Sequence, residues 1–317
     1  MRILITGGFG LLGGRLGEHF ASLGHDVVLG SRSNREVPDW LPNAQVVAMD
    51  WQKPKEIEAC VVEQDVIIHA AGVNASDCAQ DPVEALAFNG VATARLVDAV
   101  AKVGGKKRFI YLSTAHVYAA PLVGLITEES CPRNRHPYAT SHRAGEDVVL
   151  YAWQQGLVDG LVIRLSNAYG RPMHPAVDCW MLLVNDLCRQ AVSCGEMVLK
   201  TSGEQPRDFI ALSDLCRLLE NYLNRLLPEP AGRVVNVGSG RSVLVLEMAK
   251  RIQKRCMITL GISPALRYPL SQGGTPALEL CYQGQWGGET MPSCDPENDG
   301  EIDALLQVCQ AWFGTRE

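Results

Sequence analysis

The stretch Thr6-Gly7-Gly8-Phe9-Gly10-Leu11-Leu12-Gly13 follows an apolar run directly and opens a helical pattern. In such a turn Gly7 permits the sharp bend, Gly10 lets the backbone approach a pyrophosphate, and Gly13 lets the helix pack closely on the strand. Free backbone amides and the positive end of the helix dipole then favour an anion. We therefore expect this loop to hold the phosphates of a dinucleotide; the alternative is a tight strand-to-helix turn without a ligand.

The composition is that of an ordinary globular protein. The chain has 317 residues, 47% hydrophobic and 20% charged, with a formal net charge of −6 and a pI near 5.7. This balance argues against nucleic acid as the main partner. The 11 cysteines show neither a CxxC pair nor metal-ligand spacing, so we expect reduced thiols, no metal site and a cytoplasmic location. We expect neither a signal peptide nor a membrane span.

Short apolar runs alternate with longer amphipathic ones in the first half of the chain. This alternation predicts an α/β fold, a doubly wound Rossmann sheet of parallel strands joined by helices. The predicted strands are Ile3–Thr6, Asp26–Leu29, Gln45–Ala48, Val66–His69, Phe109–Leu112, Leu161–Leu165 and, late in the chain, Val234–Val237. The predicted helices are Leu11–Leu23, Val83–Val103 and Ser141–Gln155.

The pattern loosens after residue 170, where Pro and Gly become frequent. We interpret residues 1–170 as the dinucleotide-binding domain, with its sheet completed by about 207–240. Residues 171–206 and 241–317 are expected to form a smaller, discontinuous substrate lobe, which includes a helix near Val177–Val192.

The end of the second strand decides which dinucleotide is favoured. An acidic residue there would bind the ribose 2′-hydroxyl of NAD. The sequence has Ser31 and Arg32 instead, and a hydroxyl beside a guanidinium suits a 2′-phosphate. NADP is therefore preferred, with NAD possible if these two residues form only a solvated turn. Asp50 follows the third strand and could bind the adenine amino group or cap the next turn.

Several further motifs resemble one family, the extended short-chain dehydrogenase/reductases of the nucleotide-sugar epimerase/dehydratase group. The similarity runs from residue 1 to about 255. It rests on TGGFGLLG, HAAG at His69–Gly72, Asn89 in FNGVATARLVDA, STAHVY at Ser113–Tyr118, YATSHRAGE at Tyr138–Glu146, RLSNAYG at Arg164–Gly170, RDFI at Arg207–Ile210 and NVGSG at Asn236–Gly240. The coenzyme contacts that the loop and this resemblance imply are Gly7, Gly10, Leu11, Leu12, Gly13, Ser31, Arg32, Asp50, Trp51, Ala70, Ala71, Gly72, Tyr138 and His142.

The resemblance also implies the catalytic residues. Thr114 would hold the substrate oxygen, and Tyr138 would exchange a proton with it while a hydride moves to or from carbon. The family has a lysine four residues after this tyrosine, and here that position is His142. A neutral imidazole can hydrogen-bond a ribose hydroxyl but brings no permanent charge to Tyr138. The site is then either active with histidine as substitute or a coenzyme site with lost chemistry.

Other polar residues point to the substrate side. His116 lies two residues after Thr114, where epimerases and dehydratases of the family carry another acid or base, and His174 could face it. Asn167 and Arg207 take positions that reach a substrate diphosphate in similar enzymes; Arg207 could instead pair with Asp208. Further candidates are Asn74 in the loop after the fourth strand, Cys78 as an improbable nucleophile, and Arg267 as a second phosphate ligand.

Together these features favour an NAD(P)-dependent ketoreduction of a nucleotide-activated sugar through Thr114 and Tyr138, with His142 replacing the lysine. The alternatives are a nucleotide-sugar epimerase that uses His116, and a catalytically degenerate coenzyme-binding regulator. The family also pairs two helices across a homodimer interface. Apolar residues that could serve it here are Leu86, Leu96, Val97, Val148, Val149 and Ala152.

Overall fold

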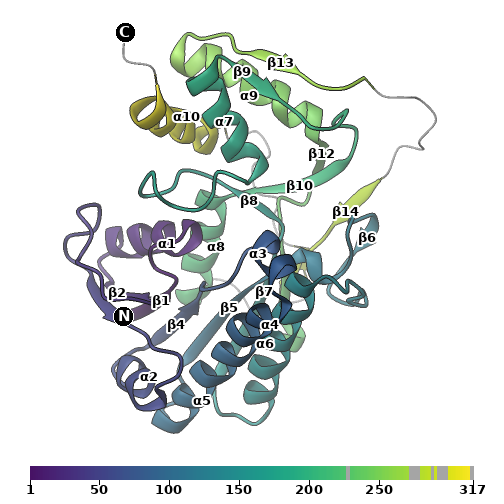
Figure 1. Cartoon of the computed structure of the whole chain (residues 1–317). Helices are drawn as coiled ribbons and strands as arrows, with labels where there is room; N and C mark the ends of the chain where they lie inside the picture. Colours follow the sequence, from purple (N-terminus) through teal and green to yellow (C-terminus); the bar gives the residue numbers. More distant parts are fainter. Residues whose placement is uncertain (226–228, 271–278, 287–288, 291–298, 315–317) are drawn as a thin grey trace.

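A seven-stranded parallel sheet forms the centre of the protein. The structure is a computed structural model that describes residues 1–225, 229–270, 279–286, 289–290 and 299–314 (Figure 1). The strands lie in the order β11-β7-β5-β4-β1-β2-β3, and every pair is parallel. They are β1 (Arg2–Thr6), β2 (Asp26–Ser31), β3 (Gln45–Ala48), β4 (Val66–His69), β5 (Arg108–Thr114), β7 (Asp159–Leu165) and β11 (Val234–Val237). The predicted Rossmann α/β fold is confirmed.

The strand order creates a switch point beside β1. The chain runs from β1 outward to β3, returns to β4 on the other side of β1, and then continues outward to β11. Ligands of such sheets bind in the crevice at the carboxyl ends of the strands, where the order reverses. The glycine-rich loop follows β1 directly, so it lies at this crevice.

Helices cover both faces of the sheet, because successive residues of β1 point to opposite faces and Ile3 to Ile5 are all buried. Ile3 and Ile5 pack with α1 and α8, whereas Leu4 packs with α2, α5 and α6. The helices are α1 (Leu11–Ser22), α2 (Pro54–Val61), α3 (Ala75–Gln80), α4 (Pro82–Ala85), α5 (Thr93–Val103), α6 (Pro137–Gln154) and α8 (Leu212–Leu223). No described helix is long and apolar enough to cross a bilayer.

Three predicted helices differ from the observed ones, and the one expected near Val177–Val192 begins only at Leu183. Instead of one helix over Val83–Val103, the chain forms α4, a π-helical segment at Leu86–Ala92 and then α5. Such π-helical insertions concentrate at functional sites, and this one contains Asn89. Helix α6 begins at Pro137 rather than Ser141, which places Tyr138 in its first turn.

A second hydrophobic core lies above the sheet in Figure 1 and joins segments from the expected substrate lobe. Its helices are α7 (Leu183–Cys194), α9 (Val245–Leu260) and α10 (Gly300–Phe313). A three-stranded sheet places β10 (Pro206–Ala211) between β8 (Asn167–Tyr169) and β12 (Ser242–Leu244). Two-stranded sheets pair β9 (Glu196–Val198) with β13 (Ala265–Arg267) and β6 (Gly124–Ile126) with β14 (Leu280–Tyr282). A further pair joins β15 (Gln285–Trp286) to β16 (Glu289–Thr290). From the span 207–240, only β11 joins the main sheet. Residues 271–278 and 291–298 of the expected lobe lie outside the described residues.

Glu301, in the first turn of α10, joins this upper core to the sheet domain. Its buried carboxylate accepts two hydrogen bonds from the Arg15 guanidinium, at 2.5 and 3.1 Å. It also accepts the backbone amides of Arg171 at 2.9 Å and Ser213 at 3.1 Å. Because Ser213 lies in the first turn of α8, the carboxylate also acts as an anion at a helix N-terminus. One side chain thus connects α10, α1, α8 and the loop after β8.

We expect Glu301→Gln to lower the free energy of unfolding by about 3 kcal/mol, because it leaves the buried Arg15 charge poorly compensated. Asp303→Asn is the matched control on the same helix, since its ion pair with Arg255 is more exposed. That change should cost about 1 kcal/mol or less. Urea titrations of both variants provide the measurement, and equal losses would contradict a special role for Glu301.

Candidate active site

In the glycine-rich loop, close backbone contacts leave no room for a side chain at Gly7 or Gly13. Gly7 has φ +67°, and a Cβ on it would lie 2.9 Å from the Ala70 carbonyl oxygen and from the Ala71 backbone. A Cβ on Gly13 would overlap the Gly7 carbonyl. Gly10 is the N-cap of α1, and no side chain caps this helix. The amides of its first turn, beginning with Leu11, are therefore available to an anion.

The ends of β2 and β3 supply the residues expected around an adenosine. Ser31 is buried, whereas Arg32 is exposed and its guanidinium stacks over Phe88 at 5.3 Å. Arg32 makes no ion pair within the described ranges, so its charge is available to a phosphate. Asp50 accepts the Gln52 amide at 2.9 Å and lies 3.5 Å from Lys53. This is the turn-capping role that the sequence left open as its alternative.

Trp51 carries a buried indole Nε1 without a hydrogen-bond partner in the described part of the chain. A buried N–H of this kind normally has an acceptor. The ring contacts His69 and Phe88 by its edge, at 6.0 and 6.1 Å between centroids. The unpaired indole N–H and the close-packed glycine loop both fit a dinucleotide with acceptor atoms along this crevice.

A chain of buried hydrogen bonds ties β4 to the glycine-rich loop. His69 Nδ1 lies 2.6 Å from the Thr6 hydroxyl, which accepts the Ala71 amide at 3.2 Å. His69 Nε2 lies 2.9 Å from the Thr93 hydroxyl. Burial lowers the pKa of His69 to about 3, so the ring is neutral. His69 therefore holds Ala70, Ala71 and Gly72 against the loop rather than titrating.

Thr114 and Tyr138 meet at the carboxyl end of β5. Thr114 is its last residue and Tyr138 lies in the first turn of α6, where Pro137 begins the helix. Burial raises the pKa of Tyr138, and a hydrogen bond to the Thr114 side chain opposes that rise. No cationic side chain of the described residues lowers this pKa. Tyr138 is therefore protonated near neutral pH.

His142 lies one helical turn after Tyr138, and their rings meet edge to face with 4.6 Å between centroids. It is buried, with 6% of its surface exposed. Burial lowers the pKa of His142 to about 4, so the ring is neutral wherever the protein is assayed near neutrality. The histidine thus occupies the position that the sequence assigned to it, but supplies no charge there.

Arg207 and His116 lie together on the substrate side. Arg207, on β10, is half-buried and has no ion pair or hydrogen bond in the described ranges. Asp208 does not pair with it, because its carboxylate binds the amide and hydroxyl of Ser239 at 2.9 and 3.0 Å. Burial, and next the Arg207 charge, lower the pKa of His116. An unpaired guanidinium beside a neutral imidazole suits an anionic ligand.

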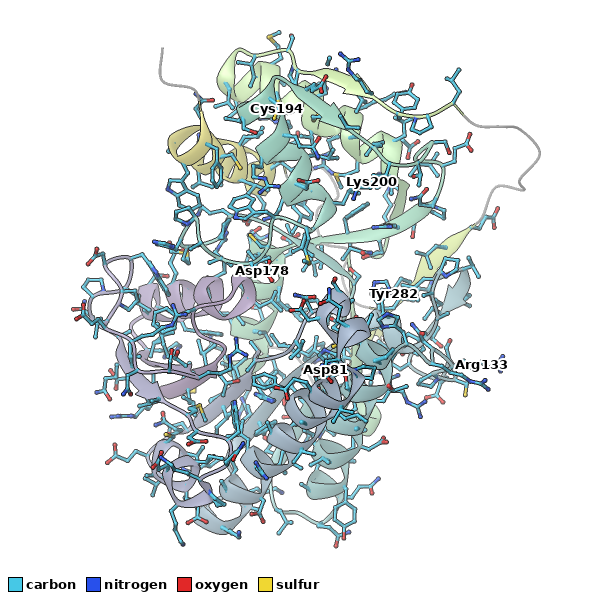
Figure 2. The ribbon with its side chains drawn as sticks, viewed as in Figure 1. Asp81, Arg133, Asp178, Cys194, Lys200 and Tyr282 are labelled. Atoms are coloured by element: carbon cyan, nitrogen blue, oxygen red, sulfur yellow. The ribbon has the colours of Figure 1, made fainter. Side chains whose placement is uncertain are left out.

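The other candidates have structural contacts. Asn167 donates to the Asp208 carbonyl at 2.8 Å, and exposed His174 accepts the Ala176 amide at 3.1 Å without contacting His116. Asn74 caps α3 and reaches Asp178 at 3.2 Å, at the boundary between the two cores in Figure 2.

The structure places Cys78 and Arg267 poorly for a nucleophile and a second phosphate ligand, the roles considered for them in the sequence. Cys78 is fully buried and burial raises its pKa, which makes it a poor nucleophile. Arg267 is exposed and pairs with Glu196 at 2.7 Å. The described residues contain no cluster of three or more ligating side chains that could hold a metal ion.

A buried ionic network behind the site was not predicted from the sequence. Glu146 accepts Ser113 at 2.5 Å and pairs with the Arg164 guanidinium at 2.7 Å. Arg164 donates to Tyr118 at 2.8 Å. Ser113 precedes Thr114, so the network fixes β5 against α6 beside Thr114 and Tyr138. Glu146 belongs to the YATSHRAGE motif, which is the one local signal that could have indicated it.

We expect Gly13→Ala to weaken coenzyme binding. Forcing a methyl group onto the Gly7 carbonyl costs roughly 1–3 kcal/mol, which corresponds to about a 5- to 150-fold loss of affinity. Gly14→Ala is the control, since its Cβ would lie 3.1 Å from the flexible Met173 side chain and at an ordinary 3.6 Å from the Gly8 carbonyl oxygen. Calorimetry with NADPH and NADH measures both variants; a Gly13→Ala variant that binds normally would remove the loop from the coenzyme site.

The comparisons with known proteins agree with this geometry. A dTDP-glucose 4,6-dehydratase of Streptomyces niveus is 29% identical over 273 residues, which cover 81% of this chain and 78% of the relative. A UDP-glucuronic acid decarboxylase 1 of Xenopus tropicalis is 27% identical, and its match covers 80% of this chain but only 60% of its own length. A UDP-glucose 4-epimerase of Thermotoga maritima, solved with UDP-glucose, shares the fold with a TM-score of 0.75 at 19% identity, covering 98% of this chain and 99% of its own. The family model for the NAD dependent epimerase/dehydratase family matches residues 3–238, and the chain belongs to that family.

Proposed function

We propose that the protein is an NAD(P)-dependent reductase that acts on the keto carbon of a nucleotide-activated sugar. The observation that carries the proposal is the Thr114–Tyr138 pair, with Tyr138 in its protonated form at the coenzyme crevice. Reduction of a ketone needs a proton donor beside the oxygen, and oxidation of an alcohol needs a proton acceptor. A tyrosine with a raised pKa and no neighbouring cation is a donor.

In this mechanism each residue has a distinct task. The Thr114 hydroxyl holds the carbonyl oxygen, and Tyr138 donates its phenolic proton to that oxygen as negative charge develops. The neutral His142 orients the coenzyme ribose through a ring N–H. Bound in reduced form, the coenzyme supplies the hydride.

The substrate class rests on Arg207. Its half-buried charge has no acidic partner among the described side chains. A partly buried charge without a partner costs free energy, and a bound anionic ligand would supply that partner. A guanidinium matches phosphate oxygens with two parallel hydrogen bonds. Both named sequence relatives act on nucleotide sugars, according to their names, which supports a diphosphate at this position. Asn167, on the neighbouring strand, and Asn74 would border the same ligand.

The preference for NADP is part of the proposal and rests on Ser31 and Arg32. The Arg32 guanidinium lies over the Phe88 ring and has no ion pair among the described residues, so its donors can reach a 2′-phosphate. The loop Gly7–Gly13, Asp50, Trp51 and the segment Ala70–Gly72 would hold the remainder of the dinucleotide. Parallel assays with NADPH and NADH decide between the two coenzymes.

An epimerase is the second candidate, because His116 adjoins the site two residues after Thr114. Its neutral ring beside Arg207 could accept a proton from a carbon next to a carbonyl. This function ranks second because an epimerase must first oxidise its substrate, which Tyr138 is poorly set to assist. A coenzyme-binding regulator without turnover remains the rival from another class.

A homodimer through α4 to α6 also belongs to the proposal, but of the residues first considered only Leu86 is an exposed apolar side chain. Leu96, Val97, Val149 and Ala152 are buried against the sheet. The exposed apolar side chains on this side are Val83, Leu86, Val91 and Tyr151, which are 79%, 48%, 48% and 63% exposed. They would be the ones to meet a second copy.

Tyr138→Phe tests the reaction. We expect NADPH consumption with keto forms of UDP- and dTDP-sugars to fall by about 10²- to 10⁴-fold, because the general acid is lost. Coenzyme affinity should stay within about twofold, since the ring remains. Absorbance at the reduced-nicotinamide band follows turnover. Retained activity would remove Tyr138 from the mechanism, and coenzyme binding without turnover of any sugar nucleotide by the wild type would favour the regulator.

His142→Lys tests the missing cation through pH. A lysine should lower the pKa of Tyr138 by about 1–3 units. The variant should therefore oxidise the product alcohol about tenfold or more faster at pH 7. Its reductive rate should begin to fall at a lower pH than that of the wild type. The wild-type oxidation rate should instead rise with pH through the neutral range. A wild-type profile that loses reductive activity between pH 6 and 7 would show that an imidazolium drives the chemistry, contrary to this assignment.

A further inference from the structure

A buried tyrosine from the sheet supports the histidine of the active site. Tyr111 lies on β5 with 1% of its surface exposed, and its hydroxyl oxygen is 3.0 Å from His142 Nδ1. The Tyr111 ring stacks on His69, with 5.6 Å between centroids and 28° between the planes. Hydrogen bonds at both nitrogens fix the His69 ring, so the surface on which Tyr111 stacks is held in place.

Helix α6 is shaped to admit this hydroxyl. Gly145 lies inside the helix, where glycine costs about 1 kcal/mol relative to alanine. A Cβ at this position would lie 2.5 Å from the Tyr111 hydroxyl oxygen and 2.9 Å from the Asn89 carbonyl oxygen. The absent side chain therefore makes the room that lets Tyr111 reach His142, three residues earlier on the same helix.

The surrounding hydrogen bonds determine where the protons lie. Thr93 donates its hydroxyl proton to the Asn89 carbonyl at 2.7 Å and accepts from His69 Nε2. The His142 carbonyl is 3.5 Å from the Tyr111 hydroxyl, beyond good hydrogen-bond geometry. The Thr93 hydroxyl also adjoins the Tyr111 hydroxyl, but Thr93 is already engaged by His69 and by the Asn89 carbonyl. We therefore assign the Tyr111 proton to His142 Nδ1, at 3.0 Å. A neutral imidazole that accepts at Nδ1 carries its own proton on Nε2.

The protonated edge of His142 faces the crevice. Its Cε1 and Nε2 atoms lie 3.7 and 3.8 Å from where a Cβ on Gly72 would be, at the end of the segment that follows β4. Nδ1 faces the opposite way, toward β5. The carboxyl end of β4 borders the switch point at which a dinucleotide binds. The Nε2–H donor is therefore presented on the coenzyme side.

We propose that Tyr111 is a positioning residue that holds neutral His142 in its Nε2–H form, aimed at a hydroxyl of the coenzyme ribose. This inference rests on the proposed function and assigns a residue and a tautomer to it.

The tautomer can be measured without coenzyme or activity. In protein labelled with ¹⁵N-histidine at pH 7, His142 should show an unprotonated Nδ1 and a protonated Nε2, with its signals assigned by their absence in His142→Gln. Tyr111→Phe should shift these signals or mix the two tautomers. A protonated Nδ1 in the wild type would overturn the proposal, whatever the enzyme catalyses.

A double-mutant cycle on coenzyme affinity tests the functional consequence. Tyr111→Phe removes a hydrogen bond worth about 1 kcal/mol. It should raise the NADPH dissociation constant about fivefold in the wild-type background. In the His142→Lys background the same change should have less than about a twofold effect, since lysine does not need the hydroxyl.

Tyr282→Phe is the matched control. Tyr282 is equally buried and ends β14 (Figure 2), and its hydroxyl donates to the Arg164 carbonyl at 2.6 Å rather than to His142. This variant should lose stability without losing coenzyme affinity. Equal effects of Tyr111→Phe in both backgrounds, or an equal loss of affinity in Tyr282→Phe, would reduce Tyr111 to a packing role. Failure of the wild type to bind either coenzyme would instead refute the proposed function and leave the tautomer result standing.

Discussion

The close approach of backbone segments at the switch point is the constraint on which the rest of the structure depends. Gly7 lies against Ala70 and Ala71, and Gly13 lies against the Gly7 carbonyl, so neither glycine can carry a side chain. The hydrogen bonds from Thr6 through His69 keep the ends of β1 and β4 in this arrangement. From that point the helix dipole, the crevice and the positions of Thr114 and Tyr138 all follow from the strand order.

Burial is the dominant electrostatic influence inside the site. It keeps His69 and His142 neutral and holds Tyr138 in its acid form. A permanent cation at residue 142 would favour the phenolate instead. The histidine at the position where the family has lysine therefore changes which proton-transfer direction the resting site favours, and this change supports the proposed reduction.

The sequence predicted the sheet well because parallel strands buried on both faces appear as short, continuous apolar runs, as Val66–His69 does. The glycine-rich loop and the positions of Tyr138 and His142 were equally local signals. Tyr111 and Glu301 were not, because each acts on residues far away in the chain and follows no spacing rule. The π-helical break at Leu86–Ala92 was missed for a related reason: its hydrophobic pattern differs little from that of an α-helix.

The same burial that makes the histidines useful as neutral groups makes the fold sensitive to acid. His142 has a pKa of about 4 and His69 of about 3 in the folded protein, against about 6.5 for an exposed histidine. Between those values the unfolded chain binds more protons, so stability falls as the pH drops from about 6.5 toward 3. A lysine at position 142 would give a different dependence of stability on pH. An amine is charged near neutrality, and burying that charge costs free energy there. The neutral histidine avoids that cost at working pH, which is why a hydrogen-bonded support such as Tyr111 is sufficient to hold it.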